Sequence, residues 1–182
     1  MKNYIAFLRA INVGGHRKIK MADLRALIES LGFQNVKTYI QSGNTVFAAP
    51  PEQRDELANI IKKQIEDSFG HDVQVLIREP EELKNILAGF PFKEKDGWKG
   101  YIGFLSDKPD SESIKNLESQ SSAIEQFKIS DDNLYVFVDK ETNQKANFSN
   151  GFIEKELGLH ATTRNLRTVQ KILNMASADT QK

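Results

Sequence analysis

The order in which strand-like and helix-like segments follow one another constrains this fold most strongly. In residues 1–79, short apolar or β-branched segments alternate with two stripes of apolar residues at helical spacing. Short apolar runs are typical of buried strands, whereas apolar residues at positions i, i+3, i+4 and i+7 form one face of a helix. The strand-like segments are 4–8, 36–40, 45–49 and 73–77, and the helical stripes cover 24–31 and 57–65. This β-α-β-β-α-β order predicts a ferredoxin-like unit.

A similar order of elements follows a predicted connecting helix. Residues 80–92 carry a helical stripe that ends at Pro91, because proline cannot continue a helix. We then expect a strand at 101–105, a helix at 110–121, paired strands at 127–129 and 134–138, and helices at 147–157 and 163–176. No strong sixth strand stands out before the last helix. We therefore predict an α+β protein with two ferredoxin-like units, the second one altered, over residues 1–79 and 93–182, joined by the helix in 80–92.

Composition and charge exclude several classes of function. The 182 residues include 25 basic and 25 acidic side chains, a formal net charge of zero, and no cysteine. Zero net charge argues against nucleic-acid binding, which usually requires a positive excess, and the lack of cysteine excludes disulfides and cysteine-bound metals. No apolar run approaches the roughly 20 residues of a membrane-spanning helix, and the opening segment is too short for a signal peptide. We expect a soluble cytoplasmic protein with no membrane partner.

A basic loop follows the first predicted strand. Residues 9–20, R-A-I-N-V-G-G-H-R-K-I-K, contain no carboxylate. The strand directions in a β-α-β-β-α-β unit bring this loop, the Q-S-G-N turn at 41–44 and the helix exit at His71 to one end of the sheet. Glycine amides and a helix N-terminus can bind an anion, although neither the P-loop nor the dinucleotide fingerprint is present. We predict that the 9–20 loop and the 41–44 turn bind a small anion that bears phosphate or carboxylate. The alternative is a flexible, solvated polar loop.

Three motifs resemble those of a widespread bacterial domain family of unknown function. They are R-A-I-N-V-G-G near the start, Y-I-Q-S-G-N in the first half, and T-T-R-N near the end. The resemblance implies an α+β fold and brings no established activity or cofactor. This chain departs from the family at Leu166, where an aromatic residue is common. The motif positions carried over are Arg9, Asn12, Gly14, Gly15, Met21, Gln41, Ser42, Gly43, Asn44, Thr163, Arg164, Asn165 and Thr168.

The predicted ligand-binding set combines the loop, the turn and the late motif. The late motif could supply a second group of donors if the two units face each other; alternatively, Thr162 or Thr163 only caps the last helix. The predicted residues are Arg9, Asn12, Gly14, Gly15, His16, Lys18, Gln41, Ser42, Gly43, Asn44, Thr163, Arg164 and Asn165.

The sequence supports no assignment of an enzymatic activity, a metal or a cofactor. His16, His71 and His160 are scattered, and no H-E-x-x-H motif or Asp-rich loop occurs. Ser42 has no acidic residue in either loop to orient a neighbouring histidine, although general acid–base chemistry by His16 stays open. Two alternatives to anion binding remain: a protein-interaction module without a ligand, and single-stranded RNA binding, which would require exposed aromatics on the first and third strands. No feature of the sequence specifies an oligomeric state.

Overall fold

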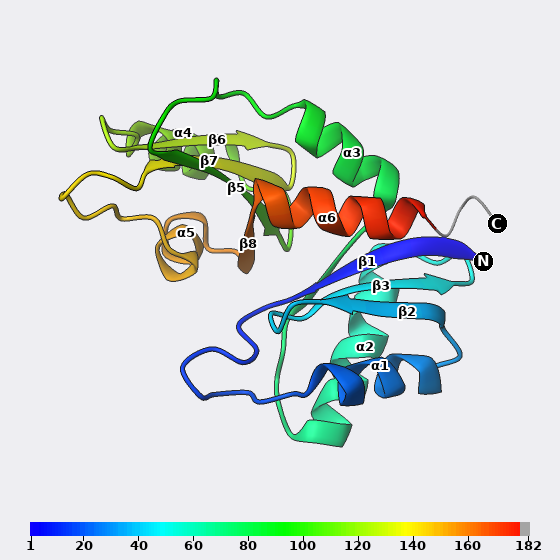
Figure 1. The fold of residues 1–182 in the computed structure, drawn as a ribbon. Coiled ribbons are helices and arrows are strands. Elements are labelled where there is room, and N and C mark those ends of the chain that lie inside the picture. The colour runs from blue at the N-terminus through cyan, green and yellow to red at the C-terminus, as the bar shows by residue number, and fades with distance from the viewer. Residues whose placement is uncertain (179–182) are drawn as a thin grey trace. The chain divides into compact units, whose positions relative to one another are not determined.

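The computed structural model describes residues 1–178 and forms two compact units. The first unit contains Met1–Asn85 and the chain from Gln170, and the second contains Ile86–Val169. Each unit has a four-stranded sheet in which the hydrogen-bonded strand pairs are antiparallel (Figure 1). No helix within residues 1–178 is long and apolar enough to cross a membrane. The predicted α+β class with two ferredoxin-like units is confirmed.

The first unit has the predicted β-α-β-β-α-β order. Its sheet has the strand order β2-β3-β1-β4, so β1 lies between β3 and β4. The elements are β1 (Lys2–Leu8), α1 (Met21–Ser30), β2 (Gln34–Tyr39), β3 (Asn44–Ala49), α2 (Arg54–Phe69) and β4 (Val75–Arg78).

Alternation along β1 directs its side chains into apolar surroundings on both faces of the sheet. Tyr4, Ala6 and Leu8 join one core with apolar side chains of α1 and α2, which cover that face (Figure 1). Ile5 and Phe7 point to the other face because successive side chains of a strand alternate, and both are fully buried. A strand buried on both faces reads as a continuous apolar run, which explains why β1 was recognisable in the sequence.

The second unit repeats the same order after a helix. Its sheet has the strand order β6-β7-β5-β8, which matches that of the first unit position by position. α4 and α5 pack on one face of this sheet through Leu117, Ile153 and Leu157. The elements of the second unit are β5 (Trp98–Leu105), α4 (Ser111–Ser119), β6 (Glu125–Ser130), β7 (Asn133–Asp139), α5 (Asn150–Leu157) and β8 (Ala161–Asn165). The helices α3 (Pro80–Ala88) and α6 (Leu166–Ser177) each contain residues of both units.

The prediction that the second unit lacks a clear sixth strand is wrong. β8 pairs with β5 along its whole length, from Ala161 opposite Leu105 to Asn165 opposite Tyr101. Four of its five residues are polar, so the segment shows no apolar run, yet Thr162 is fully buried by its neighbours. The second unit therefore has the complete order. The division into units 1–79 and 93–182 with a connecting helix in 80–92 stays a prediction.

The last helix also begins later than expected. α6 starts at Leu166 rather than at Thr163. Its first turn is capped by Asn165, whose Oδ1 accepts a hydrogen bond from the Thr168 N–H at 2.8 Å. The expected caps, Thr162 and Thr163, lie inside β8.

Candidate functional site

The loop between β1 and α1 has a backbone conformation that few sequences tolerate. Ala10, Asn12 and Arg17 have φ angles of 54°, 56° and 47°, and Gly14 and Gly15 have φ angles of 58° and 79°. A left-handed φ is rare for residues other than glycine, and each such residue costs about 1 kcal/mol or more. Such strain persists only where surrounding contacts hold the backbone. The loop is therefore a built structure rather than a flexible connection.

The side chain of Asn12 ties this loop to the 41–44 turn. Its Nδ2 donates hydrogen bonds to the carbonyl oxygens of Gln41 and Ile19 at 2.8 and 2.9 Å. Its Oδ1 accepts the Ile19 N–H at 2.9 Å. One carboxamide thus closes the loop and joins it to the turn. The loop and the turn lie at the same end of the sheet, as the strand directions required.

The turn itself is packed tightly against the loop. Gly43 has a φ of 72°, and a Cβ at this position would lie 2.7 Å from both Leu8 Cβ and Ile11 Cδ1. Asn44 is 1% exposed, and its Nδ2 donates to the Tyr39 carbonyl at 3.1 Å and to Ser42 Oγ at 2.9 Å. Gly43 and Asn44 therefore shape the turn, and their side-chain positions face the protein rather than solvent.

Two open hollows adjoin the loop. The first has a volume of about 570 Å³ and includes a residue from the connection between α2 and β4. The second has a volume of about 360 Å³ and lies at the first turn of α1. The first is lined by Ala10, Val13, His16, Arg17 and His71, and the second by Asn12, Lys18, Ile19, Lys20, Asp23, Gln41 and Phe69.

The cations at these hollows lack the carboxylate partners that many other cations in the chain have. Within residues 1–178, Arg17, Lys18 and Lys20 make no ion pair and no side-chain hydrogen bond. The Asp23 carboxylate lines the second hollow beside two of them. Ion pairs of 3.2 Å or less are made by Lys2, Arg54, Lys62, Lys63, Lys84, Lys108 and Lys128. The loop thus carries positive charge that no ion pair within residues 1–178 neutralises.

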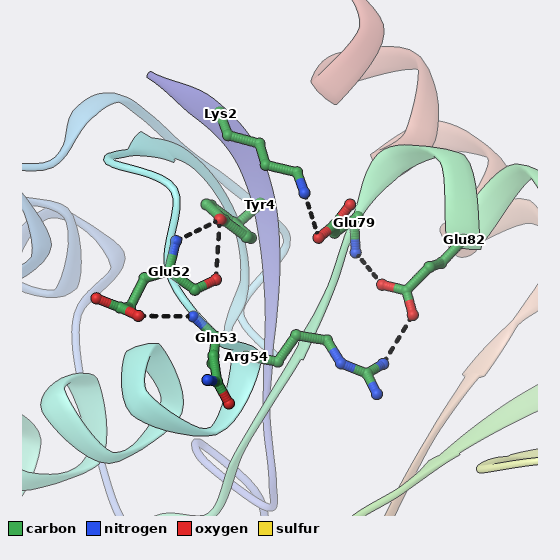
Figure 2. A network of polar contacts seen from close by, with 7 residues as sticks. All are labelled: Lys2, Tyr4, Glu52, Gln53, Arg54, Glu79 and Glu82. Carbon is green, nitrogen blue, oxygen red and sulfur yellow. Dashed lines mark hydrogen bonds and ion pairs between the residues drawn. The ribbon is translucent and has the colours of Figure 1, made fainter.

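The other end of β1 shows the contrasting arrangement (Figure 2). There Lys2 Nζ lies 2.6 Å from Glu79 Oε1, and an Arg54 guanidinium nitrogen lies 2.8 Å from Glu82 Oε1. Glu82 Oε2 also accepts the Glu79 N–H at 2.7 Å, at the start of α3. Each of these two cations therefore has a carboxylate partner within the unit.

Main-chain donors accompany the cations. α1 begins after Lys20, and no side chain caps it, so the positive end of its dipole faces the second hollow. Gly14 and Gly15 are exposed, and their N–H groups make no hydrogen bond within residues 1–178. A Cβ on Gly15 would meet nothing within 4 Å, so the backbone angle, rather than space, favours glycine there.

Arg9 is positioned by its backbone. Its N–H donates to the Gln74 carbonyl at 2.9 Å, which joins the end of β1 to the segment before β4, and its side chain is half-buried.

The late-motif residues belong to the second unit and have structural roles there. Thr163 Oγ1 donates to Asn150 Oδ1 at 3.0 Å. The Arg164 guanidinium donates to Thr162 Oγ1 at 2.8 Å and to the Thr163 carbonyl at 2.9 Å. Burial lowers the pKa of Arg164 to about 10. A ligand-binding role for Thr163, Arg164 and Asn165 stays a prediction.

Several residues at the hollows were outside the predicted ligand set. Arg17 and Lys20 continue the same run of positive charge as Lys18, so the charge pattern could have included them. His71 follows Gly70, which ends α2 with a φ of 69°, and the strand directions had placed it at this end. No signal in the sequence marks Phe69. Within residues 1–178, no group of three or more His, Asp or Glu residues could hold a metal ion.

Comparisons with known proteins identify relatives but no activity. The family model described as "Protein of unknown function (DUF1697)" matches residues 1–135. The solved structure of the conserved bacterial protein SP0830 from Streptococcus pneumoniae is similar, with a TM-score of 0.72 and 22% sequence identity over 96% of this chain and 98% of that chain. At that identity, the likeness shows the fold alone. No curated protein matches the chain.

Proposed function

The chain belongs to the DUF1697 family, whose description states no function, and we propose that it binds a small anionic ligand at the 9–20 loop and the 41–44 turn. The ligand carries phosphate or carboxylate groups. One observation carries the proposal: Arg17, Lys18 and Lys20 line the two hollows beside the 9–20 loop with no ion-pair partner within residues 1–178. A concentration of like charge without internal compensation raises the local concentration of anions.

The residues divide into those that would touch the ligand and those that position them. Arg17, Lys18 and Lys20 offer charged donors, and the N–H groups of Gly14 and Gly15 offer neutral ones. Charge-assisted hydrogen bonds to phosphate or carboxylate are about twice as strong as neutral ones. Asn12 and Gly43 would position these donors, because the Asn12 side chain donates to Gln41 and Gly43 lies against Ile11 of the loop. Asn44 would hold the turn itself through its hydrogen bond to Ser42.

The first alternative, a protein-interaction module, draws support from two exposed apolar residues. Val13 is 62% exposed and Ile40 is 51% exposed, and they lie in the loop and beside the turn. Isolated exposed apolar residues are common on protein surfaces, however, whereas three cations within residues 17–20 that make no ion pair within residues 1–178 are a more specific feature. The second alternative, RNA binding through the first sheet, loses its basis because Tyr4, Phe7 and Phe47 are fully buried.

A thermal-shift screen with a matched set of charge-removal variants tests the proposal. Sulfate, inorganic phosphate, pyrophosphate, sugar phosphates, nucleotides and di- and tricarboxylates are the probes. A ligand at 100 times its Kd adds about 2.7 kcal/mol to stability. We expect the double variant Arg17→Gln/Lys18→Gln to lose most of that gain. The control is Lys145→Gln, which removes an exposed lysine of the second unit that makes no ion pair within residues 1–178. No stabilisation by any probe, or equal losses in the control, would refute the anion site.

A further inference from the structure

We propose that anion binding at this site strengthens as the pH falls through the range in which histidine takes up a proton, because His16 and His71 line the same hollow as Arg17. The inference rests on the proposed anion site and adds a regulation to it. Histidine is the side chain that normally changes charge between about pH 5 and 8, so this site would become more cationic over a physiological interval.

The two histidines come from separate segments that the fold brings together. His16 belongs to the loop after β1, and His71 belongs to the connection between α2 and β4. His16 is exposed and His71 is half-buried, and neither imidazole makes a hydrogen bond or ion pair within residues 1–178. Both rings are therefore available to a ligand in the hollow of about 570 Å³.

The charges around the histidines are mainly positive. Arg17 lines the same hollow, and Lys18, Lys20 and Asp23 line the other hollow beside the 9–20 loop. Three cations and one carboxylate give a formal charge of +2, and protonation of both histidines raises it to +4.

The carboxylate next to His71 in the chain is already engaged. Asp72 Oδ1 lies 3.0 Å from Lys62 Nζ. An anion that enters the hollow would therefore meet Arg17 and two protonatable rings before it meets an uncompensated carboxylate. Because binding and protonation are linked reciprocally, an anion that favours the protonated rings must bind more tightly when they are protonated.

The expected effect is moderate because the hollow is open to solvent. Each added charge beside the anion acts in a high effective dielectric and is screened by salt. We expect sulfate to bind about three- to ten-fold more tightly at about pH 5.5 than at about pH 8 at low ionic strength. Added sodium chloride should reduce this ratio.

Sulfate is the probe for the experiment because its own charge does not change over this interval, whereas that of phosphate does. Shifts of the backbone amide resonances of residues 9–20 give its Kd at several pH values and constant ionic strength. In the variant His16→Gln/His71→Gln, sulfate should still bind at about pH 8, and the dependence on pH should disappear.

The third histidine provides the control. His160 lies in the second unit, where its Nδ1 is 3.7 Å from Glu154 Oε1. His160→Gln should keep the full pH dependence of sulfate binding. An affinity that does not change with pH, or a change that survives in His16→Gln/His71→Gln, would overturn the regulation and leave the anion site standing. If sulfate moves no resonance of residues 9–20 at any pH, both the site and its regulation fail.

Discussion

The two units present equivalent ends with opposite chemistry. In the first unit, residues 9–20 connect β1 to α1, and they are basic. In the second unit, residues 106–110 make the equivalent connection from β5 to α4, and its sequence S-D-K-P-D contains two aspartates. The hairpin turns differ in the same way, since Q-S-G-N in the first unit corresponds to S-D-D-N in the second. Equal topology therefore places equivalent loops together, and the residues in those loops decide what the end can bind.

The helix that starts at each end explains part of the difference. In the second unit, Asp110 caps α4 by accepting hydrogen bonds from the N–H groups of Glu112 and Ser113, each at 2.9 Å. In the first unit, Lys20 stands at the equivalent position and caps nothing. At the start of α4 a carboxylate accepts two N–H groups, whereas at the start of α1 the carboxylate of Asp23 lies in the first turn but no side chain within residues 1–178 caps the helix.

The hairpin turns show a second contrast at a backbone hydrogen bond that both units make. The last residue of β1, Leu8, donates its N–H to Gly43, and the last residue of β5, Leu105, donates its N–H to Asp132. The first turn has no room for a side chain at Gly43 because Leu8 and Ile11 lie too close. The second turn has an aspartate, Asp132, at the equivalent position. The longer loop of the first unit therefore packs on its turn and requires the glycine.

The largest effect should come from filling that space. Gly43→Ala would place a Cβ 2.7 Å from Leu8 Cβ and Ile11 Cδ1 at a φ of 72°, and we expect a loss of about 3 kcal/mol in the free energy of unfolding. Urea denaturation measures it. Gly15→Ala is the control, because its Cβ would meet nothing within 4 Å, and it should cost only about 1 kcal/mol. Equal losses would show that backbone angle, and not packing, makes the first turn different from the second.

A smaller loss should follow when the loop is released from the turn. Asn12→Ala removes three hydrogen bonds of 2.8 to 2.9 Å to Gln41 and Ile19. We expect a loss of about 2 kcal/mol in urea denaturation, together with weaker sulfate binding, because the cations would no longer be held around the hollows. An unchanged sulfate affinity would mean that the charge of the loop matters and its conformation does not. His160→Gln, a substitution in the second unit, should leave both quantities unchanged.

An N-cap aspartate at the start of α1, like the one at the start of α4, should stabilise the first unit and weaken its sulfate binding. Lys20→Asp supplies α1 with an N-cap carboxylate and removes one cation, so we expect a gain of about 1 kcal/mol in the free energy of unfolding and a loss of sulfate binding. Lys20→Gln removes the cation without supplying the carboxylate and should weaken binding less. Undiminished sulfate binding by Lys20→Asp would exclude the start of α1 from the site.

The smallest effect concerns the charge of the existing cap. The Ser113 N–H and the Ser113 hydroxyl both donate hydrogen bonds to the Asp110 carboxylate, and they lower the pKa of Asp110 below 3.8 in the folded protein. The hydrogen bond from the N–H has the larger effect on this pKa. Because the folded value is depressed, the stability that the charge contributes is present above pH 3.8 and is lost as the pH falls through the folded pKa. The advantage of the wild type over Asp110→Asn in urea midpoint should therefore shrink between about pH 7 and about pH 3. An advantage that stays constant would show that the aspartate caps α4 equally well without its charge.

Local pattern was enough to predict most of the fold. A strand or helix face that packs on a core must be apolar, so burial leaves a pattern in the sequence. This pattern predicted β1 and β3 from their apolar runs, and α1 and α2 from their apolar stripes. The sequence of β8 contains no such apolar pattern. Thr162 is buried in β8, which pairs with β5, a partner some 60 residues away in the chain. Polar β-branched residues are equally compatible with a loop or a helix start.

Some features of the candidate site can likewise be predicted from the sequence, and others depend on the tertiary structure. The run of cations after β1, the glycine pair and the Q-S-G-N turn are visible in the chain, and strand directions alone bring the loop and the turn to one end of the sheet. The sequence does not reveal that Arg17, Lys18 and Lys20 make no ion pair within residues 1–178. It also does not reveal that Asn12 joins the loop to the turn or that His71 lines the same hollow as His16. Each of these depends on which distant groups come within about 3 to 4 Å of one another. The periodicity of apolar residues indicates which face of an element is buried, but it carries no information on the distances between groups that are far apart in the sequence. The packing of the elements against one another sets these distances.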